Sequence, residues 1–178
     1  MKTLYKLLGV VLLSIFIFSS CNENMSDSSS VSSNQGTLLK GTGPSATGQG
    51  RIEGTDRVFA FNAVTHNDGS VTGQGQLTYT HNGNDVRIHF SIDCISVEDN
   101  VAIMSGTVTS SNVFESGGPC WFKVVDNGEG GNAPPDEMTG FLFCEPNDPD
   151  PQCEELTCGN DLQLELNPVE NGNIQVSQ

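Results

Sequence analysis

An alternation of apolar and polar residues with a period of two runs through much of this chain and restricts its fold more than any other feature. Successive side chains of a β-strand point to opposite faces, so the alternation predicts strands with one buried face and one wet face. The clearest apolar face consists of Val86, Ile88, Phe90, Ile92 and Cys94, and every residue between them is polar. No segment shows the sustained 3.6-residue period of an amphipathic helix. The chain is therefore predicted to be all-β.

Turn signals such as Asn67-Asp68-Gly69 and Asn82-Gly83 separate the apolar runs. Such centres accept the positive φ of tight hairpins, so consecutive strands are expected to pair antiparallel. About eight strands are predicted, at residues 45–52, 57–66, 70–81, 85–97, 100–110, 119–126, 137–144 and 172–177. A single antiparallel meander of this kind is expected to form a barrel or a barrel-like closed sheet, because closure removes exposed edges, with a two-sheet β-sandwich as the alternative. The predicted core residues are Phe59, Phe61, Leu77, Tyr79, Phe90 and Ile92.

The N-terminal residues have the three-part order of an export signal: two lysines, the 12-residue apolar run 7–18, and small residues before Cys21. The run is too short to span a bilayer as a helix. A cysteine directly after two serines resembles the lipobox of bacterial lipoproteins. This resemblance implies that residues 1–20 are a signal peptide and that Cys21 carries a diacylglyceryl anchor, which would hold the protein on a membrane. Asn22, in place of an aspartate, favours the outer membrane, on its periplasmic or cell-surface face. A secreted protein with an incidental cysteine is the alternative.

The composition of the chain after Cys21 differs between a short serine-rich segment and a longer β-rich one. Residues 22–36 contain six serines and few apolar side chains, which predicts a disordered tether. Residues 37–178 are predicted to form a single β domain. Without the two lysines of the leader, five cations remain against 22 acids, a net charge of −17. This balance argues against nucleic-acid binding, which needs clustered lysine and arginine.

Five cysteines lie beyond Cys21, and disulfides are the expected state in an exported protein. The candidates are Cys94, Cys120, Cys144, Cys153 and Cys158, and the sequence does not choose among their pairings. The last three lie in an acidic, proline-rich insert at residues 144–161, where at least one bridge is expected because the segment has no evident core of its own.

The segment 126–178 contains twelve acids and no lysine, arginine or histidine. A solvated acidic surface explains this charge, and calcium, which takes carboxylate and carbonyl oxygens, is the alternative. The residues proposed for calcium are Asp126, Glu129, Asn132 and Asp136 in a glycine-rich loop and Asp148 and Asp150 in the insert. The loop is not an EF-hand, because Gly128 and Gly130 stand where that loop needs oxygen side chains.

Several short motifs resemble those of a family of uncharacterised exported bacterial β proteins. They include Val-Asp-Asn-Gly-Glu-Gly at 125–130, Pro-Asp at 135–136 and Gly-Asn-Ile-Gln-Val at 172–176. The resemblance covers about residue 37 to the end and implies a single domain, but it implies no activity and no site residues.

No nucleophile elbow, zinc-protease motif, P-loop or dinucleotide fingerprint is present in the sequence. The chain is therefore predicted not to be an enzyme. The favoured hypothesis is a lipid-anchored, non-catalytic binding or envelope-structural module whose protein or small-molecule ligand the sequence does not identify. The alternatives are a barrel that carries a small apolar ligand, a calcium-binding module and a hydrolase.

Overall fold

The computed structural model describes residues 43–130 and 132–178. The predicted signal peptide, the lipidation site Cys21 and the predicted tether lie outside the described residues. Nearly all regular structure in the described ranges is strand, and their one helix is the single turn α1 (Pro151–Glu154). This helix is far too short to cross a membrane, and the described ranges hold no longer one.

The strands follow the predicted positions closely. They are β1 (Ser45–Ile52), β2 (Val58–Thr65), β3 (Val71–His81), β4 (Asn84–Glu98), β5 (Val101–Ser111), β6 (Pro119–Val125), β7 (Glu137–Met138), β8 (Leu142–Phe143) and β9 (Asn167–Ser177). The ends of the first six agree with the prediction to within about one residue. The seventh predicted strand is instead two short ones, β7 and β8.

The last strand is longer than predicted. It begins at Asn167 and not at residue 172, because the pair Asn171-Gly172 is a bulge within β9 and not the turn that it resembles. Asn171 has a φ of 53°, and the register of β9 against β1 shifts between Gln49 and Arg51. A β-bulge absorbs extra residues without ending the strand.

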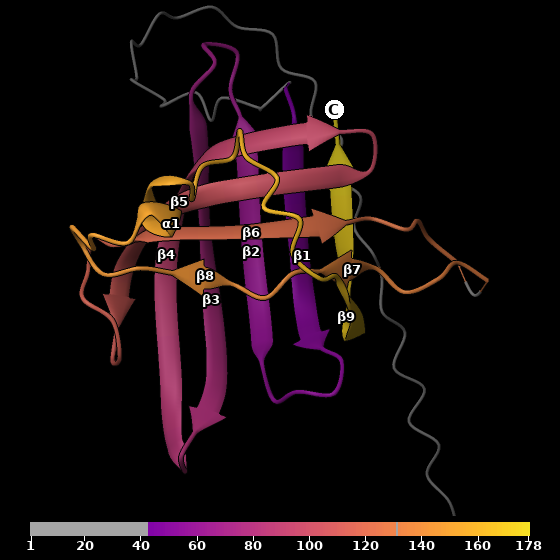
Figure 1. Cartoon of the computed structure of the whole chain (residues 1–178). Coiled ribbons are helices and arrows are strands. Elements are labelled where there is room, and N and C mark those ends of the chain that lie inside the picture. The colour runs from indigo at the N-terminus through magenta and orange to yellow at the C-terminus, as the bar shows by residue number, and fades with distance from the viewer. Residues whose placement is uncertain (1–42, 131) are drawn as a thin grey trace, which may run out of the picture. The chain divides into compact units, whose positions relative to one another are not determined.

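The strands form one closed antiparallel sheet. Their hydrogen-bonded order is β5-β4-β3-β2-β1-β9-β7-β6, and β6 pairs back onto β5, so eight strands make a ring and β8 adds to β6. In Figure 1, β1, β2, β3 and β9 lie side by side, while β6 runs across them on the other side of the barrel. The predicted barrel is thereby confirmed.

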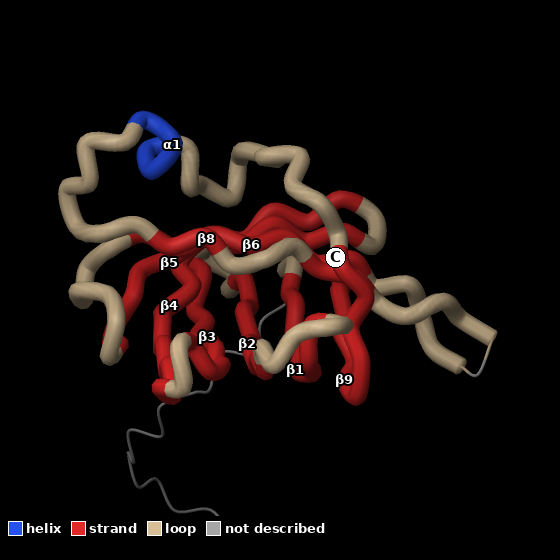
Figure 2. The backbone as a smooth tube through the Cα atoms, turned by 60° about the horizontal axis from the view of Figure 1, so that its bottom comes forward, coloured by secondary structure: helices blue, strands red, loops and turns tan. Residues whose placement is uncertain are grey.

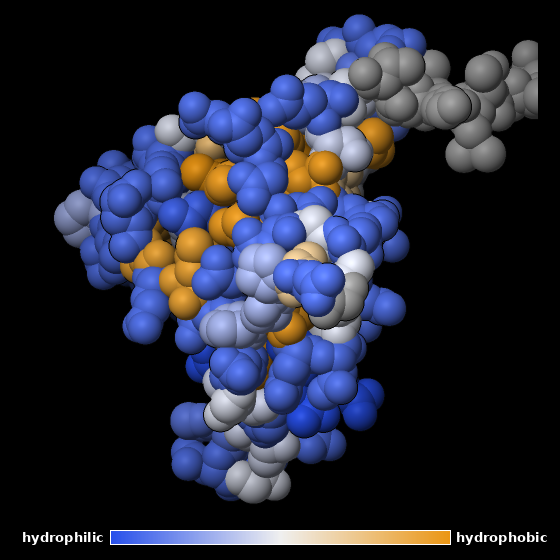
Figure 3. All heavy atoms as spheres, turned by 90° about the vertical axis from the view of Figure 1, so that its right-hand side faces the viewer, coloured by the Kyte–Doolittle hydropathy of each residue, from blue (hydrophilic) through white to orange (hydrophobic). Residues whose placement is uncertain are grey.

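Aromatic side chains fill the interior of the barrel. Phe122 lies at its centre, with ring centroids 5.2 Å from Phe61, 5.8 Å from Phe90 and 4.7 Å from Phe141. Of the predicted core residues, five are at most 5% exposed and Tyr79 is half-buried. Hydrophilic residues cover most of the surface seen from the right-hand side of Figure 1, and hydrophobic ones show only in small areas among them (Figure 3).

One predicted face is corrected by the structure. The register between β4 and β5 shifts between Ile92 and Cys94, so the alternation along β4 changes phase there. Ile92 remains in the interior, whereas Cys94 lies opposite Ser105, which in turn lies opposite Trp121 on the outer face. The placement of Cys94 on the inner apolar face was therefore wrong, because a period of two holds only where no bulge intervenes.

Replacement of Phe90 by alanine is expected to lower the free energy of unfolding by about 3–5 kcal/mol, from lost burial and the cavity left behind. Phe90 is 1% exposed and its ring lies against the bare backbone of Gly75. Urea unfolding measures the effect, with Val113→Ala at a 49% exposed position as the control. A loss for Phe90→Ala below about 1 kcal/mol would contradict the assignment of the interior.

Candidate functional site

The glycine-rich loop after β6 holds the free edge of β9. The described part of the chain pairs β9 with β7 only at Asn167 and Pro168, so the rest of this edge has no partner strand. Two carboxylates take that place. Asp136 Oδ2 accepts a hydrogen bond from the Ile174 amide at 2.7 Å, and Asp126 Oδ2 accepts one from the Val176 amide at 2.9 Å. The loop thus closes the seam of the barrel, which is the part of the β9 edge beyond its short pairing with β7.

Further hydrogen bonds hold this loop in shape and attach it to β9. The second oxygen of Asp136, a residue only 7% exposed, accepts the Asn127 amide at 2.9 Å. Glu129 Oε1 accepts hydrogen bonds from Asn173 Nδ2 at 2.8 Å and Gln175 Nε2 at 3.4 Å. Three of the acids proposed as calcium ligands therefore bind groups of β9 or of the loop itself.

The other proposed calcium ligands are separate from these. Asn132 is exposed. In the insert, Asp148 Oδ1 accepts the Asp150 amide at 3.0 Å, and Asp150 caps α1 by accepting the Gln152 amide at 2.9 Å. The structure does not gather the acids of the loop and of the insert at one point, and calcium binding stays a prediction.

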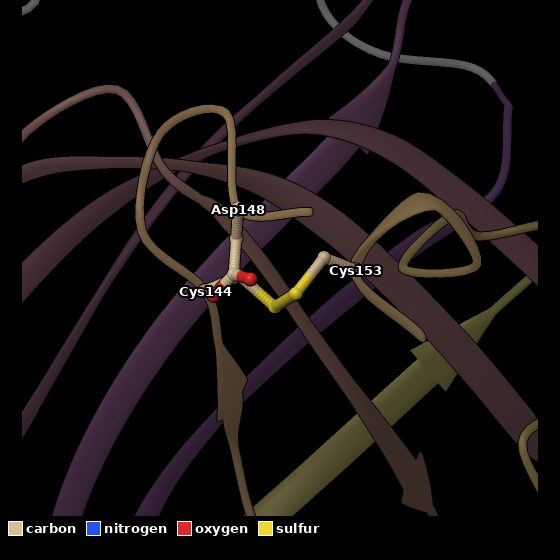
Figure 4. Close-up of side chains that lie close together, drawn as sticks. All are labelled: Cys144, Asp148 and Cys153. Atoms are coloured by element: carbon tan, nitrogen blue, oxygen red, sulfur yellow. A yellow bond between two sulfur atoms is a disulfide. The ribbon is translucent and has the colours of Figure 1, made fainter. Parts of the chain in front are cut away.

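Among the described residues, one group of three potential metal ligands converges: Cys144, Asp148 and Cys153, whose ligand atoms lie within 4.8 Å of one another. Figure 4 shows the Asp148 carboxylate beside the two sulfurs, which are bonded to each other. Metal binding by cysteine requires thiolates, and a disulfide has none. In this oxidised form the group is a structural disulfide with a neighbouring carboxylate and not a metal centre.

The described residues form two disulfides, Cys94–Cys158 and Cys144–Cys153. The expected bridge within the insert is confirmed by the second of these. Among the cysteines of the described ranges, Cys120 is free, and burial raises the pKa of its thiol to about 12. A thiol with this pKa is protonated at neutral pH, so Cys120 is a packing residue and a poor nucleophile.

The insert covers the outer face of β5 and β6. Trp121 is fully buried beneath it, and its indole Nε1 donates to the carbonyl oxygens of Thr157 at 3.1 Å and Asn160 at 3.2 Å. Lys123 Nζ forms an ion pair with Asp161 at 2.8 Å. The segment that carries α1 lies over β6 in Figure 2. The role of the insert, which the sequence left open, is to shield one side of the barrel.

A polar groove of about 570 Å³ lies on the outer face of β2, β3 and β4. Two rows of directly paired residues cross these strands. One row is Asn62, Gln74 and Ser91, and the other is Ala60, Gln76 and His89. Side chains paired in this way stand about 5 Å apart on the same face of a sheet.

A second hollow of about 420 Å³ adjoins the groove and shares Gln76 and His89 with it. Its further lining includes Thr78, Thr80 and Arg87. The sequence placed His89 on the polar side of its strand, but it did not single out the two glutamines. Only cross-strand register brings them together with His89.

No family model, curated protein or solved structure matches this chain. The resemblance to exported bacterial β proteins stays a prediction, and no site residue is carried over from another protein.

The structure predicts a large cost for removal of the Asp136 carboxylate. Asp136→Ala leaves the Ile174 and Asn127 amides without their acceptor, and a loss of about 2–3 kcal/mol in the free energy of unfolding is expected. Urea unfolding measures the loss, and amide exchange at Ile174 should become faster. The control is Glu165→Ala, which removes the same charge from an exposed position.

Equal losses of unfolding free energy in Asp136→Ala and Glu165→Ala would contradict the role of Asp136 in holding β9 to the loop. The same unfolding experiments in calcium and in magnesium at matched ionic strength also test the calcium prediction. Stabilisation by calcium alone, absent from Asp136→Ala, would support a calcium site in the loop.

Proposed function

We propose that this chain is a lipid-anchored, non-catalytic binding module of the bacterial cell envelope and that its binding surface is the polar groove over β2, β3 and β4. The observation that carries this proposal is the groove itself. Gln74, Gln76 and Asn62 offer both donors and acceptors, and Ser91 and His89 add a hydroxyl and an imidazole. A small number of placed polar groups in a concave surface is typical of a ligand site.

The chemistry of the groove favours a neutral, hydroxyl-rich ligand such as an envelope glycan. Amide side chains can donate to one hydroxyl and accept from a neighbouring one, and the small side chain of Ala60 leaves room beside Gln76 in its row. An anionic polymer fits less well, since the full chain carries a net charge of −15.

The other functions considered from the sequence have less support. Buried aromatic rings occupy the interior where a carrier would hold an apolar ligand. The thiol of Cys120 is buried and protonated, which disfavours a cysteine hydrolase. The acids of the glycine-rich loop already accept hydrogen bonds from backbone amides, which weakens the case for a calcium-binding module.

The groove proposal is tested by co-sedimentation of the mature chain with insoluble envelope polysaccharide. The triple variant Gln74→Ala/Gln76→Ala/His89→Ala should bind at least about tenfold more weakly, since each neutral hydrogen bond contributes about 1 kcal/mol. The matched control is Gln152→Ala/Gln178→Ala, which truncates exposed amide side chains far from the two rows of the groove. Failure of the wild type to sediment, or equal binding by both variants, would refute the proposal.

The anchor is tested separately. Cys21→Ser should move the protein from the membrane pellet to the soluble fraction, because the acyl chains provide its attachment. Mass spectrometry of the wild type should find the diacylglyceryl group on an N-terminal Cys21. A mature wild-type chain that starts elsewhere and carries no lipid would exclude the lipoprotein assignment.

A further inference from the structure

A third hollow, distinct from the polar groove and from the hollow that adjoins it, lies at one open end of the barrel. Its volume is about 260 Å³. The residues that line it come from β3, from the residue before β2, from the loop after β5 and from the region of β8: Arg57, Leu77, Tyr79, Phe114, Phe141, Leu142 and Phe143. Mouths of β-barrels are frequent sites of small-ligand binding.

The walls of this mouth pocket are aromatic. Ring centroids lie 6.0 Å apart for Phe141 and Phe143 and 5.4 Å apart for Phe114 and Phe143. These three rings are half-buried, whereas Phe90 and Phe122, deeper in the same cluster, are at most 1% exposed. The mouth therefore offers apolar surface that the fold itself leaves partly uncovered.

Arg57 places a positive charge at this apolar surface. Its guanidinium lies 5.5 Å from the centre of the Tyr79 ring. The ion pairs within the described ranges are Arg51 with Glu170 and Lys123 with Asp161, and Arg57 belongs to neither. The neighbouring Asp56 directs its carboxylate to the Thr80 amide, at 2.7 Å. The Thr80 hydrogen bond, with a smaller contribution from the Arg57 charge, lowers the pKa of Asp56. No carboxylate of the described residues is in ion-pair contact with the Arg57 guanidinium, which lies beside an aromatic pocket.

We propose that the mouth pocket binds a small organic anion, a carboxylate with an aromatic or short aliphatic body. The body lies against the rings of Phe114, Phe141 and Phe143, and the carboxylate binds the Arg57 guanidinium, whose fork geometry suits a bidentate contact. A cavity of about 150 Å³ holds benzene. A pocket of about 260 Å³ therefore has room for one ring and a carboxylate. This site shares no lining residue with the groove, although Tyr79 also lines the hollow that adjoins the groove.

The experiment compares phenylacetate with phenylacetamide, its neutral isostere, by NMR titration of the full mature chain. Phenylacetate should bind saturably, and phenylacetamide at least about tenfold more weakly, because only the acid pairs with the guanidinium. Arg57→Gln should remove this preference. Arg87→Gln, which neutralises another exposed arginine outside the pocket, should leave it unchanged.

A second variant separates the apolar contribution from the charge. Phe143→Ala should weaken both probes by a similar factor, since both place a ring against that wall. Absence of saturable binding at millimolar phenylacetate, equal affinity for acid and amide, or equal effects of Arg57→Gln and Arg87→Gln would each overturn the proposal. None of these outcomes bears on the glycan test of the groove.

Discussion

The barrel depends on two hydrogen bonds in which carboxylates of the loop after β6 replace a missing strand. β7 supplies only two residues to pair with β9, and beyond them Asp136 and Asp126 accept the amides of Ile174 and Val176. Without these acceptors the edge of β9 would leave backbone donors unsatisfied and would offer a template for pairing with other chains. The aromatic interior is enclosed because this seam is closed.

The acidic C-terminal third has several structural tasks. Its carboxylates close the seam through Asp126 and Asp136, cap α1 through Asp150 and pair with Lys123 through Asp161. Charge that would repel itself in an unstructured segment is thus partly stabilised by hydrogen bonds from backbone amides and, at Asp161, balanced by the buried Lys123. The insert uses the last of these contacts, together with the Cys94–Cys158 bridge, to dock on the outside of β5 and β6.

The groove and the mouth pocket differ in chemistry. The polar side chains of the groove over β2, β3 and β4 are neutral amides, hydroxyls and one imidazole, so it suits a ligand that is recognised through hydrogen bonds. The mouth pocket combines half-buried rings with one guanidinium, so it suits an amphipathic anion. The groove arises from side chains at matching cross-strand positions, and the mouth pocket from the end of β3 together with loop residues at one end of the barrel.

The sequence by itself determined the class of fold and the position of most strands, because alternation and turn residues act through neighbours in the chain. It also identified the interior positions Phe59, Phe61 and Phe90, and it located one disulfide in the insert. Tertiary structure decided which face Cys94 occupies, since a bulge changes the phase of the alternation. It also decided which groups the loop carboxylates bind and which residues line the groove and the mouth pocket. Asp136 and Ile174 are 38 residues apart, and Asp126 and Val176 are 50 apart, so no local pattern could pair them. Those contacts exist only because closure of the sheet brings the loop between β6 and β7 alongside β9.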